Sequence, residues 1–387
     1  MKKVVILDGS AIQAIPVAQS LKKLGYYTVL LCNTKKSYGY RTRYADEKII
    51  SPSTQNDREA FHRFFLDLVQ KEHYDIAIPM GDYSAQYLSL HRDELRAFTS
   101  FVIPPYDVFM NGYDKNELMQ SCQEHNFPHP RSFDLSSDNL DEAAKYIDFP
   151  ALIKPNHTTG ARGFVIVNSE DELKEQVPLT IKNYGPCHLQ EFIQAGGKQI
   201  KVELFISNGT VINATAIHKM RFYPEKGGSS CFNQAVLQDE AVELCSNVLK
   251  EIKWEGFADF DLIEDPRDNV LKIMEINPRI PACIKVSFKS GVNFAENIVS
   301  ESLGLPASKY EFKPGAYLRY FGLDLLWFLK SKQRFKTHPS WFKAFLRSDH
   351  YYQDGSLADL RPFIYGTLGG LLKQLNPQFR ASKRGMN

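Results

Sequence analysis

Residues 257–279 read FADFDLIEDPRDNVLKIMEINPR, which is one strand pattern, a turn and a second strand pattern. The Asp-Pro and Asp-Asn steps in the middle are typical of turns, so the stretch predicts a β-hairpin. Side chains two residues apart on a strand share a face. Glu275 and Asn277 therefore point the same way, and Asp261 on the partner strand lies within reach of both.

These three side chains offer two carboxylates and one carboxamide, which are the oxygen ligands that Mg²⁺ prefers when it is bound to a nucleotide. Arg279 continues the same line with a fixed charge suited to a phosphate or a carboxylate. Spacing alone is equally compatible with the ordinary polar face of a hairpin. The arginine favours the interpretation as a magnesium site.

A second pattern lies in residues 150–167, PALIKPNHTTGARGFVIV. One strand delivers Lys154, a loop with Gly160 and Gly163 follows, and another strand leaves. Such glycines let backbone amides close over phosphates, and the lysine supplies a point charge. A flexible hairpin with a surface lysine gives the same pattern, so this stretch alone leaves both interpretations open.

The composition is that of a globular protein of two or three domains. The chain has 387 residues, 43% of them apolar and 24% charged, which argues against intrinsic disorder and against a fibre. No apolar run approaches the roughly 18 residues of a membrane-spanning helix, and the basic start leads into a strand pattern rather than a signal segment. Six cysteines without a CxxC pair predict reduced, buried thiols. We therefore expect a cytoplasmic protein.

Charge is distributed unevenly along the chain. The net charge is +2, but residues 316–387 hold 12 Lys/Arg against 4 Asp, a balance of +8. Such a segment suits an acidic partner, a phosphorylated substrate or an anionic membrane surface, whereas the overall charge argues against a general nucleic-acid binder. The helical spacing of Leu326, Leu329 and Phe335 favours packing against the core. The alternative is an amphipathic surface for a membrane.

The order of strand and helix patterns predicts a mixed fold. Residues 1–110 alternate strands and helices, which predicts a parallel sheet of Rossmann-like type. Its first turn has the single Gly9 where a dinucleotide fingerprint needs three glycines, so a dehydrogenase is a distant alternative. From residue 150 the chain is rich in strands, which predicts an α+β domain with antiparallel sheets.

Five blocks in this order resemble the ATP-grasp superfamily, in its carboxylate-amine ligase branch, over residues 1–305. The blocks are Asp114-Lys115, IKP with the glycine loop, Gln190-Glu191-Phe192-Ile193, GFADFDL and EINPR. The resemblance implies a preATP-grasp domain over 1–110, which helps to bind the acceptor. It implies an ATP-grasp domain over 111–310 with a flexible lid at about 125–190. Residues 311–387 then form a basic, aromatic C-terminal extension.

The resemblance also implies roles for individual residues. Lys115 and Lys154 match the lysines that contact ATP phosphates, and Gly160 to Gly163 match the loop that covers them. The adenine edge would bind at the hinge residues Gln190, Glu191, Phe192 and Ile193. Asp261, Glu275 and Asn277 match the ligands of Mg²⁺ or Mn²⁺. Arg279 matches the arginine that steadies the transferred phosphoryl group, and it acts as a catalytic residue together with Lys154.

The chain departs from the family pattern at two places. Residues 197–200, GKQI, lack the glutamate that many members use for the ribose. Residues 280–283, IPAC, lack the Gln-Val-Glu cluster that positions bicarbonate in biotin carboxylases, which disfavours carboxylation. The cationic segment around Lys219 and Arg221 is similar to one in carboxylate-amine ligases, and both side chains can neutralise a γ-phosphate or bind a carboxylate. A solvated strand end is the alternative.

The resemblance implies an ATP-dependent ligase that joins a carboxylate to an amine through an acyl phosphate. Its partners are small-molecule substrates, and we expect no nucleic acid. A homodimer, a contact with the inner face of the membrane and a role in cell-surface polysaccharide or wall-precursor synthesis are further expectations. The rival from another class is an ATP-binding sensor or scaffold without ligase activity.

Overall fold

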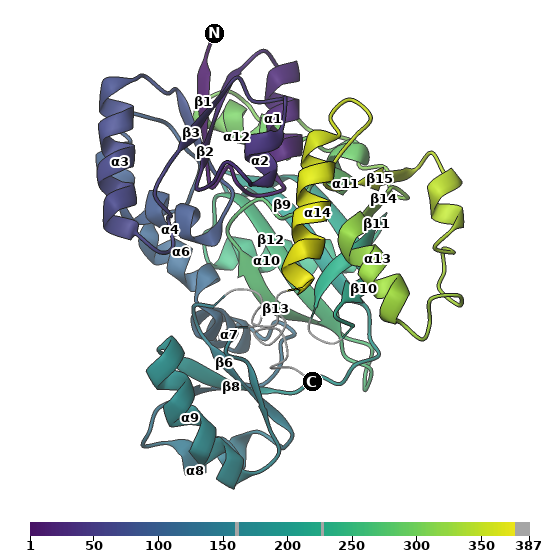
Figure 1. Cartoon of the computed structure of the whole chain (residues 1–387). Helices are drawn as coiled ribbons and strands as arrows, with labels where there is room; N and C mark the ends of the chain where they lie inside the picture. The colour runs from purple at the N-terminus through teal and green to yellow at the C-terminus, as the bar shows by residue number, and fades with distance from the viewer. Residues whose placement is uncertain (159–161, 226–227, 376–387) are drawn as a thin grey trace.

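The N-terminal part of the chain is a four-stranded parallel sheet in the order β3-β2-β1-β4, as the alternating pattern predicts. The computed structural model describes residues 1–158, 162–225 and 228–375. Val5 and Leu7 of β1 pack with α3, whereas Val4 and Ile6 pack with α1, so helices cover both faces (Figure 1). The elements are β1 (Lys3–Leu7), α1 (Ala14–Lys23), β2 (Tyr27–Cys32), α2 (Tyr38–Arg41), β3 (Glu47–Ile50), α3 (Arg58–Lys71), β4 (Ile76–Pro79), α4 (Asp82–Leu90), α5 (Arg92–Leu95) and α6 (Tyr106–Tyr113).

The predicted lid contains a small antiparallel sheet in the order β5-β8-β6-β7. Helix α8 contributes Leu140 and Ala143 to a single buried cluster, and helix α9 contributes Leu173 and Val177 to the same cluster. This part of the chain therefore has a hydrophobic core of its own. It projects from the rest of the molecule at the bottom of Figure 1. Its elements are β5 (Ser132–Leu135), α8 (Leu140–Tyr146), β6 (Ala151–Pro155), β7 (Val165–Val167), α9 (Glu170–Tyr184) and β8 (Cys187–Glu191).

The central sheet has seven strands in the order β13-β12-β9-β10-β11-β14-β15. All neighbouring pairs are antiparallel except β14 and β15. The mixed fold with antiparallel sheets that the sequence predicts is confirmed. The strands are β9 (Gln199–Ser207), β10 (Thr210–Tyr223), β11 (Ser229–Val236), β12 (Gly256–Glu264), β13 (Leu271–Asn277), β14 (Tyr317–Arg319) and β15 (His350–Tyr352). The helices are α7 (Lys115–Glu124), α10 (Asp239–Glu251), α11 (Lys285–Lys289) and α12 (Phe294–Ser302).

The segment after residue 310 is part of the fold rather than an appended extension. Its strands β14 and β15 continue the central sheet, and its helices are α13 (Phe321–Lys330), the short 3₁₀ helix η1 (Lys343–Leu346) and α14 (Arg361–Leu375). Asp359 accepts a hydrogen bond from the Thr42 hydroxyl at 2.8 Å, and Arg41 lies over the Tyr365 ring, so the segment also docks on the N-terminal part. The segment thus packs against the core, but not through two of the three side chains from whose spacing this was predicted, because Leu329 and Phe335 are 59% and 74% exposed.

Two further expectations concern exposure. All six cysteines are buried and unpaired, as predicted. In the part of the chain that the structure describes, we find no helix with the length and apolarity needed to span a bilayer.

Candidate active site

A cavity of about 520 Å³ lies where three parts of the chain meet. The central sheet supplies most of its charged lining, the N-terminal part supplies Ser10 to Gln13, and the segment after residue 310 supplies Tyr320, Leu323 and Gln353. Three acidic and four basic side chains line the cavity: Asp82, Asp261, Glu275, Lys115, Lys201, Lys219 and Arg279. The basic side chains can bind an anion, and the acidic side chains can bind a metal cation attached to that anion.

The predicted hairpin is formed by β12 and β13. Asp261 lies directly opposite Glu275 in the antiparallel register, and Asp259 lies opposite Asn277. Directly opposite residues put their side chains on one face of a sheet. Asp261, Glu275 and Asn277 all line the cavity, so the structure brings these three predicted side chains together.

Two lysines hold Asp261 in its ionised form. The Nζ atom of Lys219 lies 2.6 Å from Asp261 Oδ1, and that of Lys201 lies 3.3 Å away. Burial alone raises the pKa of Asp261, but the charges of the two lysines outweigh it and lower this pKa below the usual value. The carboxylate is therefore charged and available as a ligand at neutral pH.

Lys201 and Asp259 are site residues that the sequence analysis missed. Their side chains are 2.5 Å apart, and Asp259 is fully buried. Burial raises the pKa of Asp259 to about 6, although the charge of Lys201 opposes this shift. A charged residue within the apolar run QIKVELF of β9 was the available signal, because β9 pairs with β12 and places Lys201 opposite Asp261.

Arg279 is held by groups from three elements. Its Nε atom lies 3.1 Å from Asp82 Oδ1 at the start of α4. One terminal nitrogen donates to Asn277 Oδ1 at 3.0 Å, and the other lies 3.7 Å from Asp259 Oδ2. Burial lowers the pKa of Arg279, but the surrounding carboxylates raise it overall, so the guanidinium is a fixed charge in the cavity.

The two predicted phosphate lysines differ in their placement. Lys115 lines the cavity, donates to the Thr158 carbonyl at 2.7 Å and lies 3.8 Å from Glu275 Oε2. Lys154 in β6 is buried and is absent from the described lining. Burial lowers its pKa to about 8, while the charge of Glu275 acts in the opposite direction. Lys154 is thus close to the cavity and sensitive to pH.

The predicted loop over the phosphates is described only in part. Gly160 lies outside the described residues. Gly163 has a φ of +74°, and a Cβ there would lie 2.8 Å from the Tyr184 ring and 2.9 Å from Pro155. Only glycine suits such a backbone without strain. Gly163 thus fixes the returning end of the loop against α9.

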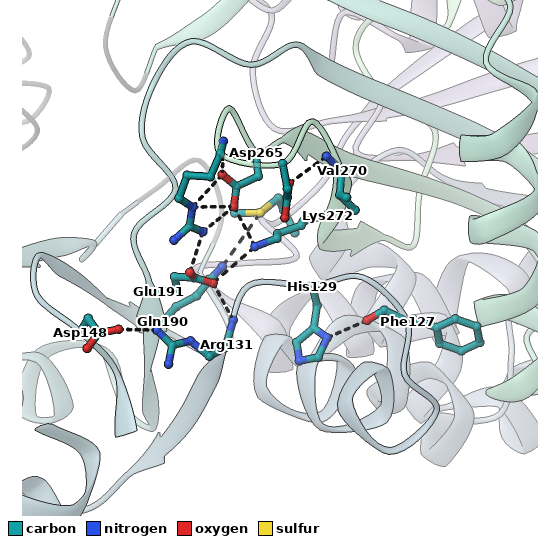
Figure 2. A network of polar contacts seen from close by, with 12 residues as sticks. Phe127, His129, Arg131, Asp148, Gln190, Glu191, Asp265, Val270 and Lys272 are labelled. Atoms are coloured by element: carbon teal, nitrogen blue, oxygen red, sulfur yellow. Dashed lines mark hydrogen bonds and ion pairs between the residues drawn. The ribbon is translucent and has the colours of Figure 1, made fainter. Parts of the chain in front are cut away.

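The predicted hinge lies at the end of β8, and its side chains are absent from the described cavity lining. Glu191 Oε1 lies 2.6 Å from an Arg267 nitrogen, and Oε2 lies 3.6 Å from Lys272 Nζ (Figure 2). Burial raises the pKa of Glu191, but the hydrogen bonds from Arg267 and the Arg131 amide lower it overall. The carboxylate ties the lid to the β12–β13 hairpin rather than pointing freely toward a base.

Of the other hinge residues, Gln190 and Ile193 are buried and Phe192 is half-buried. Gln190 is fully buried, and its Nε2 atom lies 4.0 Å from the Met274 sulfur. Ile193 is 9% exposed, and Phe192 lies between it and Glu191. The hinge stays a prediction for the adenine edge, carried by main-chain groups.

The structure corrects the role that the sequence analysis predicted for Arg221. Lys219 lines the cavity as expected, but the β10–β11 register shifts between Lys219 and Arg221, and the two side chains part. Arg221 is buried, donates to both Asp324 oxygens at 2.8 and 3.2 Å, and lies 3.8 Å from the Phe232 ring centre. It anchors α13 to the sheet, so its placement does not support a phosphate role.

The oxygen-bearing side chains fit a magnesium ion. Glu275 has its nearest described cation at 3.8 Å, which leaves its carboxylate free to act as a ligand. Asp261 is ionised and Asn277 offers its carbonyl oxygen in the same cavity. Such a set of hard oxygen donors is what Mg²⁺ takes from a protein that also presents phosphates.

Several lining residues gave no sequence signal. Tyr38 and Tyr320 line the cavity from opposite ends of the chain, and their hydroxyl groups are hydrogen bonded to each other. Asp82 reaches the site because α4 begins beside the end of β1, where Gly81 approaches Asp8. These contacts arise from tertiary packing, which no local pattern records.

Comparisons with known proteins agree with this geometry. A family model described as "Carbamoyl-phosphate synthase L chain, ATP binding domain" matches residues 114–299. The carbamoyl phosphate synthase large chain of Campylobacter jejuni is 26% identical over 291 residues, which are 70% of this chain and 25% of that protein. The D-aspartate ligase of Enterococcus faecium is 26% identical over 250 residues, 58% of either chain. The chain thus spans about a quarter of the length of the carbamoyl phosphate synthase large chain and about three fifths of the length of the D-aspartate ligase.

Solved structures share the fold. The biotin carboxylase domain of the Hydrogenobacter thermophilus 2-oxoglutarate carboxylase, a dimer in complex with MgADP and bicarbonate, superposes with a TM-score of 0.67 at 20% identity. The match covers 82% of this chain and 73% of that one. The matched ATP-binding domain and the shared fold agree with the oxygen ligands on β12 and β13, so the predicted resemblance to the ATP-grasp superfamily, whose cofactors are ATP and Mg²⁺, is confirmed for residues 114–299.

Proposed function

We propose that the chain is an ATP-dependent ligase that joins a carboxylate to an amine through an acyl phosphate. One observation carries the proposal. A single cavity holds the oxygen ligands Asp261, Glu275 and Asn277, the fixed charge of Arg279 and a separate wall from the N-terminal part. Nucleotide and acceptor can therefore meet in one cavity.

The positions of the lining residues suggest a different role for each of them in the reaction. Lys115 and Lys219 lie beside Glu275 and Asp261, where they can balance phosphate charge. Arg279 is held rigidly by Asp82 and Asn277, so its guanidinium needs no reorganisation as charge moves from phosphate to acceptor. When bound, Mg²⁺ offsets the charge that gathers on the phosphates. No nucleophilic side chain is required.

The relatives favour a carbon–nitrogen bond. The Enterococcus relative is by name a D-aspartate ligase, which suggests an amino acid as one substrate class here. Residues 280–283, IPAC, lack the Gln-Val-Glu cluster that positions bicarbonate in biotin carboxylases, and carboxylation is disfavoured for that reason. We further propose a role in the synthesis of cell-surface polysaccharide or wall precursors, at the inner face of the membrane.

The test is ADP release across a panel of amino acids and sugar acids, followed by the mass of the product. The wild-type chain should release ADP only when a matching acid and amine are both present. Glu275→Ala should lower the rate at least 100-fold with the fold intact. Glu264→Ala, on the same hairpin beside Lys198, is the matched control and should keep the rate.

The alternative is an ATP-binding sensor or scaffold. Nucleotide binding without substrate-dependent ADP release over a broad panel would favour that alternative and contradict the ligase. Equal rates for the Glu275 and Glu264 variants would contradict the site.

A further inference from the structure

Large apolar side chains are exposed on one surface of the segment after residue 310. Leu329, Phe335, Phe342 and Leu346 are 59, 74, 55 and 88% exposed, respectively. Phe335 follows the end of α13 at Lys330 rather than continuing the helix, which corrects the predicted helical spacing. These four side chains and the basic residues among them are called the 329–347 patch.

The two exposed aromatic residues of the patch, Phe335 and Phe342, share one support. The Phe328 ring contacts both Phe335 and Phe342, at centroid distances of 5.7 and 5.4 Å. Trp341 stacks on the same Phe328 ring at 4.4 Å, and Trp341 is 8% exposed. The buried rings hold the exposed ones in place, so the apolar surface is built into the fold.

Basic residues are interspersed with these apolar side chains along the chain. Six lie between Asp324 and Asp349, with no acidic residue among them: Lys330, Lys332, Arg334, Lys336, Lys343 and Arg347. Within the described chain the four lysines form no ion pair, and only Arg347 is paired, with Asp349. The patch therefore combines exposed apolar side chains with lysines that have no acidic partner among the described residues.

We propose that the 329–347 patch docks the chain on an anionic membrane surface. Aromatic and aliphatic side chains insert at the boundary of head groups and acyl chains, and lysines are attracted to anionic lipids. Each such lysine multiplies the affinity by roughly fivefold. A protein partner would need acidic side chains matched to six separate cations, whereas a lipid surface supplies negative charge at every position.

The position of the patch relates docking to the cavity. Helix α13 carries Leu323 in the cavity lining and ends at Lys330 in the patch. The seven residue steps from Leu323 to Lys330 rise about 10 Å along a helix axis. Docking would therefore hold the cavity close to the lipid head groups. This inference about the substrate rests on the proposed ligase function: a cavity close to the head groups suits an acceptor that is anchored in the membrane.

The test is sedimentation of the full chain with vesicles of phosphatidylcholine alone or with 30% phosphatidylglycerol. The wild-type chain should bind the anionic vesicles at least tenfold better, and high salt should weaken the binding. A variant with Gln at Lys330, Lys332, Lys336 and Lys343 should lose about 100-fold or more in partitioning. Its matched control carries Gln at four exposed, unpaired lysines elsewhere: Lys23, Lys35, Lys36 and Lys250.

A second pair of variants tests the apolar contribution. Ser at Phe335, Phe342 and Leu346 should reduce binding at least tenfold, whereas Leu357→Ser, at a 98% exposed position outside the patch, should not. Equal binding to both vesicle types, or equal loss in patch and control variants, would overturn the proposal. So would a patch-dependent self-association without vesicle binding. ADP release with small substrates should persist in the patch variants, so failure of docking and failure of the ligase function remain distinguishable.

Discussion

Among the charged side chains of the site, Arg279 contacts the largest number of different elements. It contacts Asp82, Asn277 and Asp259, which belong to three different elements. A guanidinium presents its donors in a planar fork, and a lysine presents one point charge, so the two cannot replace each other here. The sequence predicts Arg279 because it follows the EINP run, but the partner Asp82 lies almost 200 residues earlier in the chain.

Arg279→Lys should therefore keep the charge and lose the fixed geometry. We expect the turnover rate to fall by about 10²–10³-fold with little change in the affinity for ADP. Steady-state kinetics together with ADP titration measures both quantities. A variant with wild-type turnover would show that Arg279 does not act on the reacting groups.

If Lys154 contacts the nucleotide as predicted, nucleotide binding should depend on pH. Burial lowers its pKa to about 8, so the side chain of the free protein loses its proton as the pH rises above this value. A polyphosphate binds the charged form, and the affinity for ADP should fall up to tenfold per pH unit above pH 8. Lys154→Met should bind more weakly at pH 7 and lose this dependence. Titration calorimetry at pH 7 and pH 9.5 tests both the weaker binding and the lost pH dependence. If the affinity of the variant for ADP declined equally steeply, the pH dependence would belong to another group.

At the scale of elements, the hairpin was predictable and the sheet around it was not. Alternation along β12 and β13 and their turn residues place Asp261 opposite Glu275. The contribution of β9 could not be predicted in the same way, because which strand pairs with β12 depends on contacts distant in sequence. Lys201 reaches the site only through that pairing.

The lid hinge offers a prediction at this scale. Arg267 bridges Glu191 at the end of β8 and the fully buried Asp265 in the β12–β13 turn. Arg267→Gln should loosen the lid and raise amide hydrogen exchange in residues 132–191. Because Arg267 is 51% exposed, we expect at most about 1 kcal/mol of lost stability. Lys198→Gln, at an exposed pair beside the same hairpin, is the control, and equal exchange in both variants would contradict a hinge role.

At the scale of the molecule, the segment after residue 310 changes the account most. Sequence patterns treat residues 311–387 as an extension, yet β14 and β15 lengthen the central sheet, and Tyr320 and Leu323 line the cavity. The apolar and basic composition was visible in the sequence. Its division into a buried side at Trp327 and an exposed side at Phe335 follows from the tertiary packing.

Asp324 tests whether this segment is integral to the fold. It is fully buried and pairs with both Arg221 and Arg319, at 2.8 and 2.7 Å. Asp324→Asn leaves two buried guanidinium groups without a counter-charge, which should cost about 3–5 kcal/mol of stability. Urea unfolding measures this loss. Asp349→Asn, at a more exposed pair with Arg347, is the control, and equal stability of the two variants would mean that the buried cluster does not hold the segment in place.

The whole account depends on a nucleotide-bound divalent ion held by Asp261, Glu275 and Asn277. Electron paramagnetic resonance of Mn²⁺ titrated into the chain with and without ADP measures this directly. We predict one tight Mn²⁺ ion that needs ADP, weakened at least tenfold by Glu275→Ala and unchanged by Glu264→Ala. Mn²⁺ binding that is independent of ADP, or equal in both variants, would contradict the account.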